Sequence, residues 1–138
     1  MIRVSSIARY LWASPTTTLG LIALIAGSQG VRVRIVEGVL EAHGPALAWM
    51  LRRLTLLPNG AAAITLGHVV LGRDQRSLDA TRAHERVHVR QCEVWGPLFV
   101  PAYLVGSVVA GLRGRRLYED NPFETEARAG ASSPAVSG

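Results

Sequence analysis

Two histidines with a glutamate beside the first are the residues of this chain whose types and spacing could do chemistry. They occur in the run His84-Glu85-Arg86-Val87-His88, which fits the pattern H-E-x-x-H. Positions i and i+4 of a helix lie one turn apart on the same face, so both imidazoles can bind a single zinc ion. Glu85 lies next to that face, where its carboxylate can take a proton from a water molecule activated by the metal. The motif therefore predicts a zinc site with Glu85 as its general base.

The predicted zinc site needs a third protein ligand and keeps its fourth position for water. The other histidines and the acidic residues after the motif are His43, His68, Glu93, Glu119, Asp120, Glu124 and Glu126. Glu93 shares the helix of the motif but points away from the face of the two histidines. Glu124 and Glu126 lie in a short helix that we expect to begin at Asn121-Pro122. Residue type and spacing thus leave more than one candidate for the third ligand.

The motif, together with the later E-x-x-A at 124–127, resembles the zincin-like metallopeptidases of the gluzincin type. Its surroundings are most similar to small HExxH proteins of unassigned function. In the gluzincin type the third zinc ligand is a Glu on a later helix, often in the pattern E-x-x-A-D. The resemblance therefore implies that His84, His88 and Glu124 hold the metal, and that Glu126 does not.

The resemblance covers residues 65–128 and departs from the family at Arg128, which stands where Asp is usual. It implies an α+β, zincin-like fold, in which a small antiparallel sheet packs on the HExxH helix and a later helix carries the third ligand. Such folds also place an edge strand beside the active-site helix, to which an extended substrate backbone can add as a further strand. Residues 64–71 are our candidate for this strand.

Three more residues are candidates for supporting roles at the site. Gln91 lies one turn beyond His88 on the same face and could orient a ligand or the water, although a merely polar helix surface also explains it. Tyr118 could donate to the negative charge that develops on a substrate carbonyl oxygen, although packing of a loop tyrosine is the simpler interpretation. Glu126 remains the alternative third ligand.

The spacing of apolar residues and the positions of Gly and Pro indicate the helices and strands that must position these residues. The motif lies within a helix predicted from near Asp79 to Trp95, with Ser77 or Asp79 as its N-cap. Before this helix we expect a half-buried strand at 31–35, with its arginines facing water. A helix at 46–57, opened by Gly44-Pro45, follows it. A turn at 58–60 then leads to a strand at 61–71. Gly67 within the last strand suggests a bulge or the close approach of another backbone.

Residues 94–112 are uncharged and precede Arg113, Arg115 and Arg116, as in a transmembrane helix with a positive cytoplasmic end. A crossing would, however, separate the two histidines from Glu124 by a hydrocarbon core of about 30 Å. Gly96-Pro97 and Pro101 interrupt the segment. We therefore expect a hydrophobic hairpin that packs on the domain or dips into one leaflet.

The N-terminal segment, 1–30, is also apolar, with no charge from 10 to 31. It fits a membrane-associated amphiphilic segment, a spanning helix or a cleaved secretory signal. Pro15 and Gly20 predict a short helix, a break and a second short helix. We expect the metal-binding domain over 31–129 and a flexible tail over 130–138.

Composition excludes several other classes for this chain of 138 residues. With 49% hydrophobic and 18% charged residues it is not a disordered protein. The single Cys92 excludes an intramolecular disulfide framework and a cysteine-only zinc site. The net charge of +5 comes from arginines that are spread along the chain, and only 6% of residues are aromatic, so we expect no nucleic-acid partner.

The function predicted from these observations is a zinc-dependent hydrolase, specifically a peptidase acting on a peptide or protein substrate. The alternative is a non-catalytic metal-binding or membrane-associated scaffold of the same fold, because so small a chain leaves little surface for a substrate cleft. Its high apolar content favours association with a membrane surface or an apolar partner. We therefore expect a membrane-associated protein, and the alternatives are a cytoplasmic or a secreted one.

Overall fold

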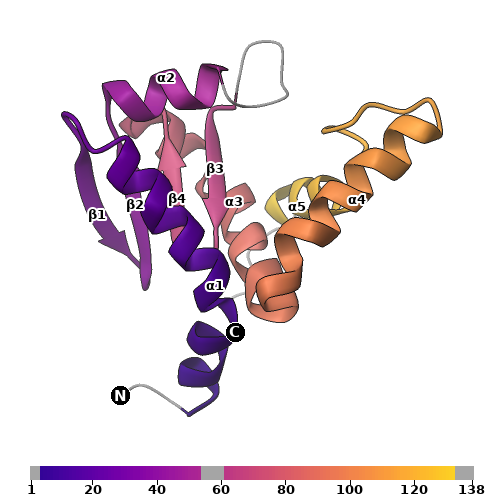
Figure 1. Cartoon of the computed structure of the whole chain (residues 1–138), viewed down its shortest axis with the longest axis horizontal. Helices are drawn as coiled ribbons and strands as arrows, with labels where there is room; N and C mark the ends of the chain where they lie inside the picture. Colours follow the sequence, from indigo (N-terminus) through magenta and orange to yellow (C-terminus); the bar gives the residue numbers. More distant parts are fainter. Residues whose placement is uncertain (1–3, 54–60, 133–138) are drawn as a thin grey trace.

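A computed structural model describes residues 4–53 and 61–132 of the chain (Figure 1). The elements in chain order are α1 (Val4–Ala26), β1 (Arg32–Val36), β2 (Val39–His43), α2 (Pro45–Arg53), β3 (Ala63–Leu66), β4 (Val69–Gly72), α3 (Gln75–Trp95), the 3-10 helix η1 (Gly96–Leu98), α4 (Phe99–Leu112) and α5 (Pro122–Ser132). Helices and a single small sheet are thus combined in one α+β arrangement, which confirms the α+β part of the predicted fold.

The strands form a four-stranded mixed sheet in the order β1-β2-β4-β3. β1 pairs with β2, and β3 with β4, as antiparallel hairpins, whereas β2 and β4 run parallel. The prediction of an antiparallel sheet is therefore wrong at its centre. The chain leaves β2 through α2 and reaches β4 only after β3, and this connection brings β4 back in the direction of β2. Of the described strands, β3 and β1 form the two edges.

The segment predicted as one strand at 61–71 is instead the β3–β4 hairpin. Gly67 has a φ of 66°, which reverses the chain in a conformation that glycine adopts readily. A Cβ atom added at Gly67 would lie 2.5 Å from the backbone nitrogen of Thr17 on α1. The bulge interpretation is therefore wrong, and the predicted close approach of another backbone is confirmed.

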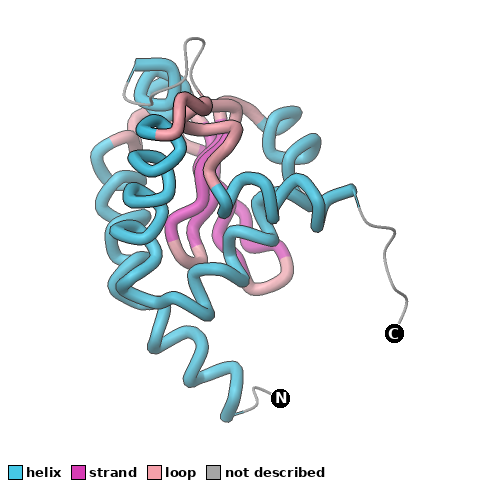
Figure 2. The backbone as a smooth tube through the Cα atoms, turned by 90° about the vertical axis from the view of Figure 1, so that its right-hand side faces the viewer, coloured by secondary structure: helices cyan, strands magenta, loops and turns pink. Residues whose placement is uncertain are grey.

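Helices cover both faces of the sheet (Figure 2). Val69 and Leu71 of β4 pack on one side in a cluster that includes Leu47 of α2 and is covered by residues of α1. Val70 points to the opposite side and packs with Leu78 and other residues of α3. The alternation along β4 therefore places α3, which carries the HExxH motif, on the other face of the sheet.

α1 is one continuous helix, so the predicted break at Pro15 and Gly20 is wrong. Proline deprives the carbonyl of Leu11 of its usual N–H partner, but the Ser14 hydroxyl donates to that carbonyl at 2.7 Å. The Thr16 hydroxyl donates to the carbonyl of Gly96 at 3.0 Å, far along the chain. One local and one long-range hydrogen bond of the polar run thus accompany a helix that continues through Pro15.

Two strand predictions in the first half of the chain need correction. β1 lies at an edge with neither face buried: Val33 is 50% and Ile35 is 75% exposed, so it is not half-buried. β2 is absent from the prediction, because its central Glu41 interrupts the apolar pattern. The helix predicted at 46–57 is present as α2 from Pro45 to Arg53. The rest of that helix and the turn at 58–60 lie outside the described residues.

α3 begins earlier than predicted and ends where expected. Its N-cap is Asp74, whose carboxylate accepts a hydrogen bond from the backbone N–H of Ser77 at 2.7 Å, so neither Ser77 nor Asp79 is the cap. At its other end Gly96, with a φ of 56°, turns the chain into η1. The motif therefore lies near the middle of a helix that is fixed at both ends.

The chain reverses after α3, as the hairpin prediction required. By length and composition alone, the helical stretch Gln75–Leu112 could cross a membrane, a test that core helices of soluble proteins also pass. The turn at Gly96 divides this stretch, and α5 returns to pack along α3. Asn121, which is fully buried, holds the start of α5 against α4 by donating to the Tyr103 carbonyl and the Ser107 hydroxyl, both at 2.8 Å.

α5 starts at Pro122, as predicted, and continues to Ser132. The first residues of the segment expected to be a flexible tail are therefore helical. Gly130 lies so close to α3 that an added Cβ would be 2.7 Å from a methyl group of Val87. Packing against α3 extends the helix, and residues 133–138 lie outside the described part of the chain.

Candidate metal centre

His84, His88 and Glu124 meet at one point between α3 and α5. Nε2 of His84 lies 2.9 Å from Oε1 of Glu124, and Nε2 of His88 lies 3.2 Å from the same oxygen. The two Nε2 atoms are 3.2 Å apart. The structure thus brings together the three residues that the resemblance implied as ligands.

The geometry of these three donors fits a zinc ion. Ligands bound to zinc at about 2.0–2.1 Å in a tetrahedron lie about 3.3 Å from one another, close to the observed donor separations of 2.9 and 3.2 Å. Two imidazole nitrogens and a carboxylate oxygen are also a donor set that zinc accepts. Within the described residues this is the group of His, Cys, Asp and Glu side chains close enough to hold a metal.

The electrostatics of the cluster favour positive charge. Burial alone would raise the pKa of Glu124, but its hydrogen bonds with His84 and His88 outweigh burial and lower the pKa well below its usual range. Burial would likewise lower the pKa of His88, yet the neighbouring Glu124 carboxylate raises it. A buried carboxylate that stays ionised beside two imidazoles is what a divalent cation requires.

Gln91 contacts one of the imidazoles, and its supporting role at the site stays a prediction. Its Oε1 lies 2.8 Å from Nδ1 of His88, where it accepts a hydrogen bond that leaves Nε2 directed at the cluster. The Gln91 amide nitrogen donates to the Phe123 carbonyl at 3.1 Å and to the Glu126 carboxylate at 3.0 Å. Glu126 therefore contacts Gln91 and lies outside the three-residue group.

Glu85 lies between the cluster and strand β3. It is only 4% exposed, and its carboxylate accepts a hydrogen bond from the Thr65 hydroxyl at 2.5 Å. Burial raises the pKa of Glu85 above its usual range. A carboxylate with a raised pKa is a better proton acceptor than an exposed one, as a general base requires.

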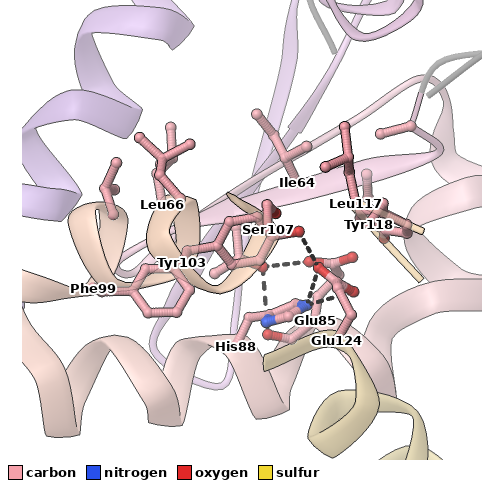
Figure 3. A pocket seen from close by; sticks show the side chains of 15 residues that line it. Ile64, Leu66, Glu85, His88, Phe99, Tyr103, Ser107, Leu117, Tyr118 and Glu124 are labelled. Atoms are coloured by element: carbon pink, nitrogen blue, oxygen red, sulfur yellow. Dashed lines mark hydrogen bonds and ion pairs between the residues drawn. The ribbon is translucent and has the colours of Figure 1, made fainter. Parts of the chain in front are cut away.

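A cavity of about 410 Å³ opens beside these side chains. Figure 3 shows Glu85, His88 and Glu124 converging at one side of it, under apolar walls from β3 and α4. The walls are formed mainly by Ile64, Leu66, Phe99, Val100, Leu104 and Leu117. Tyr118 also lines this cavity, and burial raises the pKa of its phenol, so the hydroxyl remains a neutral donor.

Sequence reasoning missed two residues that contact the site. One is Thr65, the hydrogen-bond donor to Glu85, and the other is Tyr103, whose hydroxyl donates to Oε2 of Glu124 at 2.6 Å. Burial raises the pKa of Tyr103 above its usual range, which keeps the hydroxyl protonated. The hydrophobic hairpin predicted within 94–112 was the available signal for Tyr103, because Tyr103 and Ser107 are the two polar side chains of α4.

A second buried ionic cluster lies on the sheet face of α3. Glu41, 2% exposed, accepts from Arg82 at 2.8 Å and from Arg86 at 3.0 Å. Burial alone would raise the pKa of Glu41, but the two arginines outweigh it and lower the pKa. These arginines thus anchor α3 to β2 and fix the orientation of the motif.

Comparison of this chain with protein-family models, with curated proteins and with solved structures finds no match. The resemblance to zincin-like metallopeptidases therefore stays a prediction. The function of this chain must accordingly be inferred from the geometry of the cluster and its surroundings.

Proposed function

We propose that this protein is a zinc-dependent hydrolase, specifically a peptidase. The observation that carries the proposal is the meeting of Glu124 with His84 and His88, at 2.9 and 3.2 Å, beside a buried Glu85 and an open cavity. Two imidazoles and one carboxylate leave a fourth zinc position for water, which is the ligand arrangement of catalytic rather than structural zinc sites.

In the proposed reaction, each of the site residues would have a separate role. A zinc ion held by His84, His88 and Glu124 would supply a Lewis acid that makes water more acidic and polarises a carbonyl. Glu85 would accept the proton of the attacking water and pass it to the leaving amine. The neutral phenol of Tyr118 would donate to the developing negative charge on the substrate oxygen.

A peptide in extended conformation suits the surroundings of the site. β3 is an edge strand that lines the same cavity as Glu85, and an edge strand offers unpaired backbone groups to a further strand. The mainly apolar cavity walls would accept an apolar side chain of such a peptide.

We also propose that the protein associates with a membrane, because large apolar side chains such as Leu11, Ile25 and Leu112 are more than half exposed.

Metal content and hydrolysis of two sets of variants test the proposal. Purified wild-type protein should contain one zinc per chain, and Glu124→Ala should lose it, whereas Glu126→Ala should retain it. Glu85→Gln should retain zinc but lose cleavage of a quenched-fluorescence peptide library. Wild-type protein that binds zinc and cleaves no peptide would favour the non-catalytic scaffold, and wild-type protein without zinc would refute the metal site.

A further inference from the structure

α4 presents a wholly apolar face to solvent. The face is formed by side chains that are 39–82% exposed, namely Val105, Val108, Val109 and Leu112. The helix has no charged residue, and its two polar side chains, Tyr103 and Ser107, point inward to the cavity. Figure 1 shows α4 extending away from the sheet, and none of the described elements covers its outer side. An exposed apolar face of this kind on a small protein marks a contact with a membrane or with another protein.

Positive charge follows this face directly. The helix ends at Leu112, and Arg113, Arg115 and Arg116, all exposed, come next. Arg116 forms ion pairs with Glu119 and with Asp120. Among the described residues neither Arg113 nor Arg115 forms an ion pair, although the charge of Arg115 helps to lower the pKa of the nearby Asp120. Arg113, and in part Arg115, is therefore open to an anion at the end of the apolar face.

We propose that α4 is a docking surface for an anionic lipid bilayer, with its apolar face in the interfacial layer and with Arg113 and Arg115 against lipid phosphates. Its 14 residues span about 21 Å at 1.5 Å per residue, which is less than the hydrocarbon core. The helix therefore lies in the interface and does not cross it. This geometry is compatible with the contact between α3 and α5, which a crossing would break.

The charge pattern favours lipid over a second copy of the chain. Packed antiparallel, the two α4 helices would set Arg113 of each copy against the start of the other helix, which has no acidic side chain. Packed parallel, they would bring like charges together. A bilayer surface matches both the apolar face of α4 and the arginines that follow it, because anionic headgroups lie directly beside the apolar layer.

The docking surface and the cavity share the same helix. Phe99 and Tyr103 on the inner side of α4 line the cavity, while Val105 and Val108 lie on the outer side. Docking would thus place the cavity next to the lipid surface. If the proposed hydrolase activity holds, its substrate would be an apolar segment presented at a membrane, but docking itself does not depend on zinc.

Vesicle flotation of the full-length protein tests the docking surface. Wild-type protein should bind vesicles that contain phosphatidylglycerol more tightly than vesicles of phosphatidylcholine alone, and added salt should weaken this binding. The outer-face variant Val105→Gln/Val108→Gln/Leu112→Gln should reduce binding by about tenfold or more. Arg113→Gln/Arg115→Gln should reduce it by about fivefold for each arginine.

The matched control is Ile35→Gln on β1, which removes a side chain that is 75% exposed and remote from α4, and it should leave binding unchanged. Thermal unfolding shows whether each variant folds. If the outer-face variant does not fold, vesicle binding by the arginine variant tests the proposal. Unchanged vesicle binding by both α4 variants would overturn the proposal. So would a wild-type dimer, measured by sedimentation, that binds no vesicles and that the outer-face variant dissociates.

Discussion

The hydroxyl of Tyr103 donates to Oε2 of Glu124 at 2.6 Å, while Oε1 of the same carboxylate lies 2.9 Å from His84. The two oxygens are thus held by different helices, one by α4 and one by α3. Glu124 itself belongs to α5, whose start is fixed to α4 through the buried Asn121. The orientation of the proposed third ligand is therefore set by three helices together, and this relationship makes α4 part of the candidate metal centre.

Tyr103→Phe is expected to lower zinc affinity by about 10- to 100-fold, because it removes the hydrogen bond that orients the Glu124 carboxylate. Competition against a chromogenic chelator measures the affinity. Tyr10→Phe is the matched control, since the Tyr10 hydroxyl donates to the Gly38 carbonyl, away from the cluster. Equal affinities for all three proteins would show that Tyr103 does not position the ligand.

Zinc itself should stabilise the protein, since its ligands come from α3 and α5 and meet only in the folded state. At a free zinc concentration about 100 times the dissociation constant, the stabilisation is about 2.7 kcal/mol, or a rise in melting temperature of about 5–10 °C. Differential scanning calorimetry with and without a chelator measures this rise. Glu124→Ala should show little of it, and a rise of the same size in that variant would contradict the ligand assignment.

Gln91→Ala should weaken both the cluster and the attachment of α5. It removes the acceptor for His88 and the donor to Phe123 and Glu126. We expect a loss of about 1–3 kcal/mol in the free energy of unfolding, measured by urea denaturation of zinc-free protein. Zinc affinity should fall as well, because the imidazole of His88 loses its orientation. Arg90→Ala, at an exposed position next to it, is the control and should change neither quantity.

Gly67→Ala should destabilise the fold more than the same change at Gly114. Both glycines have positive φ, 66° and 71°, so both variants incur the left-handed strain of about 1–2 kcal/mol. Only at Gly67 would the new methyl group meet the backbone of Thr17, whereas nothing lies within 4 Å at Gly114. The difference between their free energies of unfolding measures how tightly α1 packs on the β3–β4 turn. Equal losses would mean that α1 can move away.

Glu41→Gln should make the protein less stable at neutral pH and less sensitive to acid. The pKa of Glu41 is lower in the folded protein than its ordinary value of 4.5. Its stabilisation is therefore complete above about pH 5 and is lost as the pH falls through the folded pKa. We expect a loss of about 2–4 kcal/mol at pH 7, shrinking toward zero as the pH falls below the folded pKa.

The control for Glu41→Gln is Glu37→Gln. Glu37 also faces Arg86, at 3.9 Å, but its side chain is 78% exposed, so we expect a change of less than about 0.5 kcal/mol. Urea denaturation across this pH range measures both variants. A pH profile of Glu41→Gln that runs parallel to that of the wild type would contradict a lowered pKa for Glu41.

Local sequence determined the features that depend on helix periodicity and on chain breakers. The HExxH spacing places two imidazoles on one face of any helix, Gly96-Pro97 ends that helix, and Pro122 starts the last one. These signals were sufficient to predict α3, the reversal after it, and α5. They also placed Gln91 on the face of His88, whereas the choice of Glu124 over Glu126 as the expected third ligand came from the resemblance to the gluzincin type and not from spacing.

Only the tertiary structure decided the features that depend on contacts between distant segments. Thr16 ties α1 to Gly96 beside Pro15, and Arg82 and Arg86 allow the charged Glu41 to lie within a buried strand. Tyr103 reaches Glu124 only because the chain folds back at Gly96. A local pattern reports the intrinsic preference of a segment, whereas hydrogen bonds and ion pairs formed across the fold can outweigh that preference, and they exist only once the partners have met.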